Sequence, residues 1–278
     1  FLFLHDRKMD SITIWEMKKW TSTQLKNGLS PATVNRRIGV LKSMMSLAVE
    51  SGVIEKNPLT GMTQLKIDTN QKVRYLEVKE ENRLRKALEE RQDHQREARK
   101  SHNKWLISRR KESLPELSNQ FTDHLYPITL IALNTGMRRG ELFKLDWSNV
   151  SLQQRIITVE GQTAKSKKTR HIPMNDEAFH AFVTWRNQTE SKGLVFSSPA
   201  TGKKLDNIST AWNSLLNNAN IKDFRFHDLR HNFASQLVMK GVDLLTIKEL
   251  LGHSKLEMTL RYAHLAPEHK AAAVALLN

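Results

Sequence analysis

The sequence contains no cysteine and no long uninterrupted apolar run. Without cysteine there are no disulfide bonds or thiolate metal ligands, and the cytoplasm is the expected compartment. No apolar run approaches the ~20 residues that a helix needs to cross a bilayer, and the first residues are too short and poorly flanked for a signal peptide. We therefore expect no membrane partner. Internal repeats, a glycine-rich phosphate loop and a dinucleotide fingerprint are also missing, so nucleotide-driven chemistry is not indicated.

The most prominent feature that is present is positive charge. The 278 residues carry 44 lysines and arginines against 29 aspartates and glutamates, a net charge of +15. Such a surplus favours polyanions, because each phosphate that a basic side chain neutralises releases condensed counterions. Composition alone leaves open both a nucleic-acid-binding protein and a basic protein that is merely soluble. The length and the 39% hydrophobic content suffice for two globular domains.

The N-terminal part predicts a small helical domain. Helical periodicity is weak over residues 1–21 and strong over Ser30–Ser51, which has an N-cap serine, a proline at its first helical position and Gly52 after its last turn. Basic residues off its apolar stripe serve either solubility or phosphate contact along a DNA groove. These candidate DNA-binding residues are Arg36, Arg37 and Lys42.

A domain boundary is expected in the polar stretch Leu59–Val73, which follows the helix-stopping pair Asn57-Pro58 and predicts a linker. We predict one domain over residues 1–66 and a second over 67–278. Because the chain begins with Phe1 rather than methionine, we expect the first domain to be incomplete at its N-terminus.

The second domain is predicted to combine helices with a short β-hairpin. Two β-rich runs, Arg155–Val159 and Thr169–Met174, flank a turn that contains Gly161 and three lysines. Leu194–Phe196 predicts a short strand or extended segment. Helical patterns cover Glu77–Glu90, Leu125–Gly136, Arg138–Leu145, Asp176–Asn187 and Ile208–Ala219. The fold class is therefore mainly α with a small antiparallel β-sheet (α+β).

The segment 91–122 is dense in charge and poor in apolar anchors. The favoured interpretation is a solvated insertion that extends a helix or forms a loop. The alternative is a basic arm that lies on a DNA backbone.

The reactive side chains gather in the stretch 224–263. His227 and Arg230 are three residues apart and share a helix face. A second amphipathic helix, Asp243–Leu251, ends at Gly252 and is followed at once by His253, with Tyr262 nine residues later. Taken singly, such residues often only cap helix ends. A metal site at His227 and His231 is a further alternative, but a supporting set of ligands is missing, so we expect no metal.

The motifs TGMRRGEL, the lysine-rich hairpin, HDLRH, LLGH and the trailing tyrosine resemble those of the tyrosine recombinases, or phage-type integrases. The resemblance covers nearly the whole chain. Residues 1–66 resemble the helical core-binding domain of that family, and residues 67–278 resemble its catalytic domain with a charged insertion near 91–122.

The resemblance implies a role for each reactive residue. Arg138 and Arg230 would clamp the scissile phosphate, Lys165 would protonate the leaving 5′ oxygen, and Tyr262 would attack to form a 3′-phosphotyrosyl link. His227 and His253 would orient the phosphate and manage the proton of the nucleophile. Lys167 and Lys168 compete with Lys165 and are candidate DNA contacts. A phenol is a poor nucleophile unless nearby cations favour the phenolate, and we expect the cationic site to do so.

The resemblance also implies the biological setting. We expect a site-specific recombinase that needs neither metal nor ATP and is free of cofactors, associated with the nucleoid and serving a mobile element. Double-stranded DNA would be its substrate, a homotetramer on two duplexes its assembly, and DNA-bending or directionality proteins its accessories. The apolar terminal stretch Pro267–Leu277 would dock on a neighbouring protomer. A type IB topoisomerase-like enzyme and a non-catalytic DNA-binding protein of the same fold are the alternatives.

Overall fold

The computed structural model describes residues 1–67, 73–161, 168–189, 192–198 and 201–266. The chain divides into two compact units, Phe1–Lys72 and Val73–Asn278, each with its own hydrophobic core. This division lies six residues after the boundary predicted at 66/67.

Unit 1 is built on two helices, α1 (Ile14–Lys26) and α2 (Pro31–Glu50), preceded by the short 3-10 turns η1 (Leu2–Leu4) and η2 (Met9–Ser11). Helix α2 has the predicted termini. The weak helical periodicity over 1–21 corresponds only in its second part to a helix, because a capping box between Thr13 and Glu16 starts α1 at Ile14. The core of unit 1 is the apolar stripe of α2 packed on α1, namely Val34, Ile38, Leu41, Met45 and Met17.

The predicted linker begins too early. Leu59 and Met62 are buried in the core of unit 1. Asn35 of α2, which is itself buried, then fixes the following chain: its amide donates to the Leu65 carbonyl at 2.8 Å and accepts from the Leu65 N–H at 2.9 Å. The polar composition of this stretch concealed two apolar anchors, and residues 59–65 belong to unit 1.

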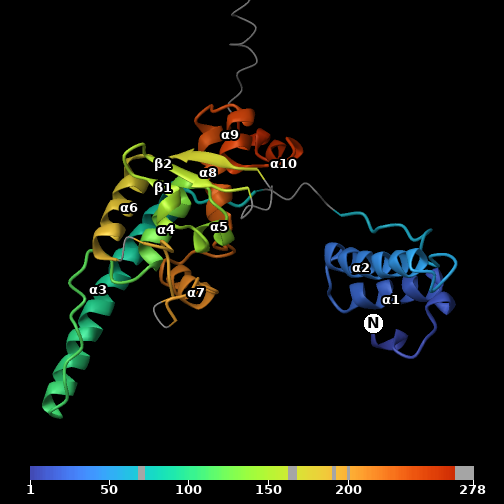
Figure 1. Cartoon of the computed structure of the whole chain (residues 1–278), viewed down its shortest axis with the longest axis horizontal. Helices are drawn as coiled ribbons and strands as arrows, with labels where there is room; N and C mark the ends of the chain where they lie inside the picture. Colours follow the sequence, from blue (N-terminus) through green and yellow to red (C-terminus); the bar gives the residue numbers. More distant parts are fainter. Residues whose placement is uncertain (68–72, 162–167, 190–191, 199–200, 267–278) are drawn as a thin grey trace, which may run out of the picture. The chain divides into compact units, whose positions relative to one another are not determined.

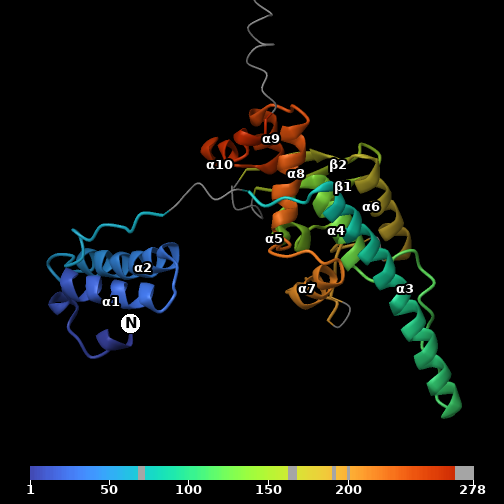
Figure 2. The ribbon, with the colours of Figure 1, turned by 180° about the vertical axis from the view of Figure 1, so that it is seen from behind.

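Unit 2 starts with one long helix, α3 (Val78–Ser108), which extends well past the predicted end at Glu90. Its C-terminal half extends away from the rest of unit 2, and the chain returns alongside it (Figures 1 and 2). Arg91 pairs with Asp123 of the returning chain at 2.6 Å, and Asn103 binds the Leu114 backbone in both directions. The charged segment therefore extends helix α3 and then returns alongside it as an irregular segment, as the favoured interpretation predicted.

The centre of unit 2 is the apolar helix α4 (Leu125–Thr135), which packs against α6 (Asp176–Gln188) and α8 (Asp228–Met239). Gly136 ends α4 in the left-handed region, with φ +60°, and the short helix α5 (Arg139–Phe143) follows at once. The 3-10 turn η3 (Trp147–Asn149) leads from α5 into the sheet.

The sheet is small and antiparallel, in the order β1 (Val150–Ser151), β2 (Ile156–Val159) and β3 (Arg170–Pro173). The hairpin β2–β3 is as predicted, with Val159 opposite Arg170 at the end where the connecting segment joins the two strands. The two-residue strand β1 was not predicted. Leu194 forms an isolated bridge with Asp146, in agreement with the predicted extended segment.

The remaining elements are α7 (Ser209–Asn218), α9 (Leu244–Leu251), α10 (Glu257–Leu260) and η4 (Ala263–Leu265). Asp243 caps α9 and Gly252 ends it in the left-handed region, as its sequence pattern predicts. The α+β fold class, with helices dominant, is confirmed. Within the described residues, no helix is both long and apolar enough to cross a membrane.

Candidate active site

Arg230 lies at the centre of the candidate site, where α4, α8 and α9 meet. The residue is only 3% exposed, and its guanidinium donates to two backbone carbonyls, Gly136 O at 2.8 Å and Leu251 O at 2.6 Å. Both acceptors are at the C-terminal ends of helices, where carbonyls have no intrahelical partner and the helix dipole favours a cation. Burial, together with the nearby Arg138, lowers the pKa of Arg230 to about 9, which still leaves it charged at neutral pH.

Arg138 lies beside Arg230, held at the start of α5 by Glu141. Glu141 accepts the Arg138 backbone N–H at 2.8 Å and one guanidinium N–H at 2.8 Å, and the other end of the guanidinium donates to Gly252 O at 3.4 Å. A surface helix-cap arginine would not reach across to the end of α9. The structure therefore brings Arg138 and Arg230 together, although they are far apart in the sequence.

Glu141 also holds a third arginine, Arg170 of β3, through two hydrogen bonds of 2.6 and 3.1 Å. Burial of Glu141 disfavours its charge, but Arg170 and Arg138 outweigh this and lower its pKa to about 2. Arg170 donates in addition to Leu250 O at 3.0 Å. A Cβ on Gly252 would lie 2.9 Å from Arg170 Cδ, so glycine is needed there for space as well as for its φ of +64°.

Sequence reasoning missed this ion-paired cluster. Glu141 lies in the TGMRRGEL motif, three residues after Arg138, and that spacing was the available signal. For Arg170 the only signal in the sequence was its inward-facing position on a predicted strand. Through this arginine, the lysine-rich hairpin is tied to the end of α9.

The two predicted imidazoles, His227 and His253, flank the arginines. His227 is exposed at the N-terminus of α8, and His253 follows α9 and shares a 2.8 Å hydrogen bond with Thr259. Although His227 keeps part of its side chain in solvent, desolvation and then the charge of Arg230 lower the pKa of both histidines, that of His253 to about 3. At neutral pH both rings are therefore uncharged hydrogen-bonding groups.

Tyr262 is buried, with only 1% of its surface exposed, between α8, α9 and the η4 turn. Its hydroxyl lies 2.7 Å from Nδ1 of His231, the imidazole one turn after His227. Burial raises the pKa of Tyr262, and the charges of Arg230 and Arg261 only partly offset this. The expectation that cations would favour the phenolate is therefore wrong in this conformation, because desolvation of the phenol dominates.

The only role that the sequence suggests for His231 is the alternative one of a metal ligand. Its ring meets that of His227 edge-on, at 5.5 Å between centroids, and its Nδ1 is taken by Tyr262. Among the described residues, no group of three or more His, Cys, Asp or Glu side chains is arranged to hold a metal ion.

The lysines are only partly described. Lys165 and Lys167 lie outside the described residues, as does the predicted docking segment Pro267–Leu277. Lys168 is exposed and lines a cavity of about 270 Å³ with Arg170, Lys248 and His253. Its three basic side chains outnumber the one carboxylate in the lining, Glu249, so this cavity beside His253 suits contacts with phosphate.

The candidate DNA-binding residues of α2 differ in their surroundings. Arg36 and Arg37 are exposed, and Arg37 donates to Gln24 at 3.3 Å. Lys42 instead donates to the carbonyls of Met62 at 3.1 Å and Thr60 at 3.4 Å, so its ammonium holds the end of unit 1.

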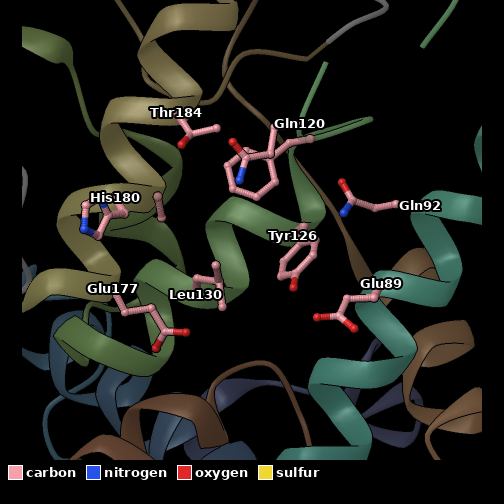
Figure 3. Close-up of a pocket in the computed structure, with 10 residues that line it drawn as sticks. Glu89, Gln92, Gln120, Tyr126, Leu130, Glu177, His180 and Thr184 are labelled. Atoms are coloured by element: carbon pink, nitrogen blue, oxygen red, sulfur yellow. The ribbon is translucent and has the colours of Figure 1, made fainter. Parts of the chain in front are cut away.

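A second cavity, of about 420 Å³, lies between α3, α4 and α6 (Figure 3). Glu89 and Glu177 face it from opposite sides, and Tyr126 and Leu130 line it between them. Glu177 is already paired with Arg85 and accepts from Asn134 at 2.7 Å. None of the predicted catalytic residues lines this cavity, so it is separate from the candidate active site.

The arrangement of two guanidiniums, neutral imidazoles and a tyrosine is suited to transferring a phosphoryl group to a phenol. Comparison with known proteins gives the class. Residues 111–269 match the phage integrase family. The integrase of Salmonella phage P22 is 34% identical over 163 residues, which are 55% of this chain and 42% of that protein. A XerC-like tyrosine recombinase of Caldanaerobacter subterraneus is 26% identical over 99% of this chain and 73% of its own length.

Solved structures share the fold. The Tn1549 transposon integrase, in complex with a circular intermediate DNA, matches with a TM-score of 0.71 at 22% identity, covering 100% of this chain and 90% of that one. The catalytic domain of bacteriophage HP1 integrase matches with a TM-score of 0.50 at 26% identity, covering 73% of this chain and 95% of that one.

This chain belongs to the phage integrase family, the tyrosine recombinases. It spans less than half the length of the P22 integrase.

Proposed function

We propose that this chain is a site-specific DNA recombinase that cuts and rejoins strands through a 3′-phosphotyrosyl intermediate, in the integration or excision of a mobile element. The observation that carries the proposal is the convergence of Arg138, Arg230, His253 and Tyr262, from four separate elements, around the C-terminal ends of α4 and α9. A non-catalytic DNA-binding protein would not need a buried guanidinium, that of Arg230, beside a buried tyrosine.

The proposed reaction develops negative charge at the scissile phosphate, and the site residues would neutralise it. Attack of the Tyr262 oxygen on phosphorus forms one P–O bond while the bond to the 5′ oxygen breaks, and negative charge accumulates on the non-bridging oxygens. Arg138 and Arg230 would neutralise that charge with preorganised N–H donors, and the neutral His227 and His253 would add hydrogen bonds. Lys165 would protonate the leaving oxygen. Because the tyrosyl ester keeps the phosphodiester energy, rejoining needs no ATP, and the guanidiniums take the charge-neutralising role that Mg²⁺ has in other phosphoryl transfers.

The substrate is double-stranded DNA. The net charge of +15 supports this, as do relatives of the same fold solved with DNA, among them the Tn1549 transposon integrase. We further propose a homotetramer on two duplexes, in which Pro267–Leu277 docks on a neighbouring protomer, with accessory DNA-bending proteins. Arg36 and Arg37 of α2, with Lys167 and Lys168 of the hairpin, would contact the backbone.

A covalent-trapping experiment tests the chemistry. Nicked duplexes from the DNA that flanks the gene are incubated with the protein, so that the short fragment released by cleavage diffuses away and the adduct accumulates. The wild-type chain should give a protein–DNA band that survives denaturation. Tyr262→Phe should give none, because only the nucleophilic oxygen is lost. Tyr126→Phe is the matched control, since it removes a hydroxyl elsewhere in unit 2, and should keep the adduct.

The other outcomes identify the alternatives. An adduct that persists in Tyr262→Phe contradicts the proposal. Salt-sensitive binding without any adduct would identify a non-catalytic DNA-binding protein. Relaxation of supercoils on arbitrary DNA by a monomer would identify a topoisomerase-like enzyme.

A further inference from the structure

The hydroxyl of Tyr262 has one side-chain partner in the described part of the chain, and it is neither of the imidazoles to which the resemblance gives a role. Oη of Tyr262 lies 2.7 Å from Nδ1 of His231. The two rings are tilted, with centroids 5.9 Å apart, so the contact between them is a hydrogen bond and not ring stacking. His253 instead bonds to Thr259.

We propose that His231 is a further catalytic residue, which accepts the proton of the Tyr262 hydroxyl as the phenolic oxygen attacks phosphorus. This inference rests on the recombinase function proposed above. In the step, the Oη–H bond breaks and its proton goes to His231 Nδ1, the Oη–P bond forms, and the bond from phosphorus to the 5′ oxygen breaks. The leaving oxygen takes its proton from the general acid, so protons and charge balance.

A proton acceptor inside the site is needed because the phenol is buried. At 1% exposure, Tyr262 cannot release its proton directly to bulk water, and burial raises its pKa. A base within hydrogen-bond reach of the hydroxyl meets the geometric requirement for general-base catalysis. His231 is also one turn from His227 on the same face of α8, so the proton is received next to the proposed phosphate site.

His231 is in the correct protonation state for this role. Its pKa is lowered to about 4, first by burial and then by His227, while Asp228 partly opposes the shift. The groups that act on it are His227, Asp228 and Arg230 from its own helix and Arg261 from the segment of α10. At neutral pH the imidazole is therefore uncharged. When it carries its one proton on Nε2, Nδ1 is free to accept from the phenol.

The first test compares single-turnover cleavage of the nicked duplex by the wild type and two variants. His231→Asn keeps an amide group near the place of Nδ1 and can still accept a hydrogen bond, but it is not basic. We expect it to cleave at least about 10²-fold more slowly, the range expected for loss of a general base. His231→Ala should be equally slow and should regain part of its rate when imidazole is added. His264→Asn, an exposed histidine two residues after Tyr262, is the matched control and should cleave normally.

The pH profile separates a base from a merely structural contact. The wild-type rate should not depend on His231 between pH 5 and 8, because the imidazole is already neutral. In His231→Ala the phenol must lose its proton without the imidazole, so the rate should rise with pH. A duplex with sulfur in place of the 5′ bridging oxygen has a leaving group that needs no proton. It should rescue a variant of the general acid, but it should not rescue His231→Asn.

The wild-type protein gives a second, independent measurement. Nitrogen NMR of the folded chain should find His231 neutral at pH 7, with its proton on Nε2. A proton on Nδ1 would overturn the inference, and so would a His231→Asn protein that cleaves as fast as the wild type. A His231→Ala protein that cleaves faster than the wild type would mean that the contact restrains Tyr262, which also overturns it. Failure of the wild type to form any adduct would instead count against the recombinase function itself.

Discussion

Replacing Glu141 with glutamine should destabilise unit 2 by about 3 kcal/mol at neutral pH, without changing the size of the side chain. Glu141 is 4% exposed and ion-pairs with both Arg138 and Arg170. Its pKa falls from 4.5 to about 2 on folding. At about 1.4 kcal/mol for each pH unit, this difference corresponds to about 3 kcal/mol of folding free energy. Loss of one partner from a buried ion pair costs a similar amount, since the arginines stay charged.

The sign of the pH dependence is fixed by the same shift. Because the folded pKa of Glu141 is lower than the unfolded one, its contribution is fully present above about pH 4.5. It is lost as the pH falls from 4.5 towards about 2, where the folded carboxylate becomes protonated. The stability difference between the wild type and Glu141→Gln should therefore be constant from pH 8 to 5 and should shrink below pH 4.5.

Urea unfolding followed by tryptophan fluorescence is a suitable assay, because the buried tryptophans all lie in unit 2: Trp147, Trp185 and Trp212. The control is Glu97→Gln, which removes an ion pair with Lys100 on the exposed surface of α3. It should leave the midpoint unchanged, since exposed pairs contribute little. A Glu141→Gln protein as stable as the wild type at pH 7, or a deficit that stays the same at pH 3, would refute this reasoning.

Two further substitutions test the geometry of each unit. Gly136→Ala should destabilise unit 2 by about 2–4 kcal/mol, measured by the same unfolding assay, because the new Cβ would lie 2.4 Å from Phe233 and the backbone is left-handed. An unchanged midpoint would show that Phe233 can move aside. Asn35→Ala should expose residues 59–65 to proteolysis, because it removes both hydrogen bonds to Leu65 and about 1–2 kcal/mol of local stability. Equal cleavage of Asn35→Ala and the wild type in this stretch would contradict that.

Helix termini were the most predictable part of the fold, because their signals are local. Ser30 and Pro31 start α2, Gly136 ends α4, and Asp243 and Gly252 bound α9, all as the sequence indicates. Each position follows from a cap or a left-handed residue that acts within one turn. The length of α3 was not predictable in this way. Its second half carries few apolar residues, and it contacts the returning chain through polar groups such as Asn103, which binds the Leu114 backbone.

In the candidate site, too, local signals were predictable from the sequence and contacts between distant segments were not. The motifs suffice to propose Arg138, Arg230 and Tyr262 as site residues, because such a proposal needs only residue type and order. They could not show that His231 contacts Tyr262, since this depends on how the α10 segment folds back on α8. Nor could they show that the phenol is more strongly affected by burial than by the neighbouring cations. Desolvation is a property of the packed chain, and no local pattern reports it.

The cluster around Glu141 determines which arginines of the candidate site have a carboxylate partner. Arg138, Arg170 and Arg230 converge there, and Glu141 ion-pairs with the first two but not with Arg230, whose partners are backbone carbonyls. Burial, followed by the charge of Arg138, lowers the pKa of Arg230, and Glu141 only partly opposes this. A phosphodiester placed between Arg138 and Arg230 would supply the missing negative charge. The negative charge that develops on the phosphate oxygens in the transition state would then face guanidinium donors that are already held in place. Preorganised donors of this kind accelerate a reaction because they stabilise the transition state more than the ground state.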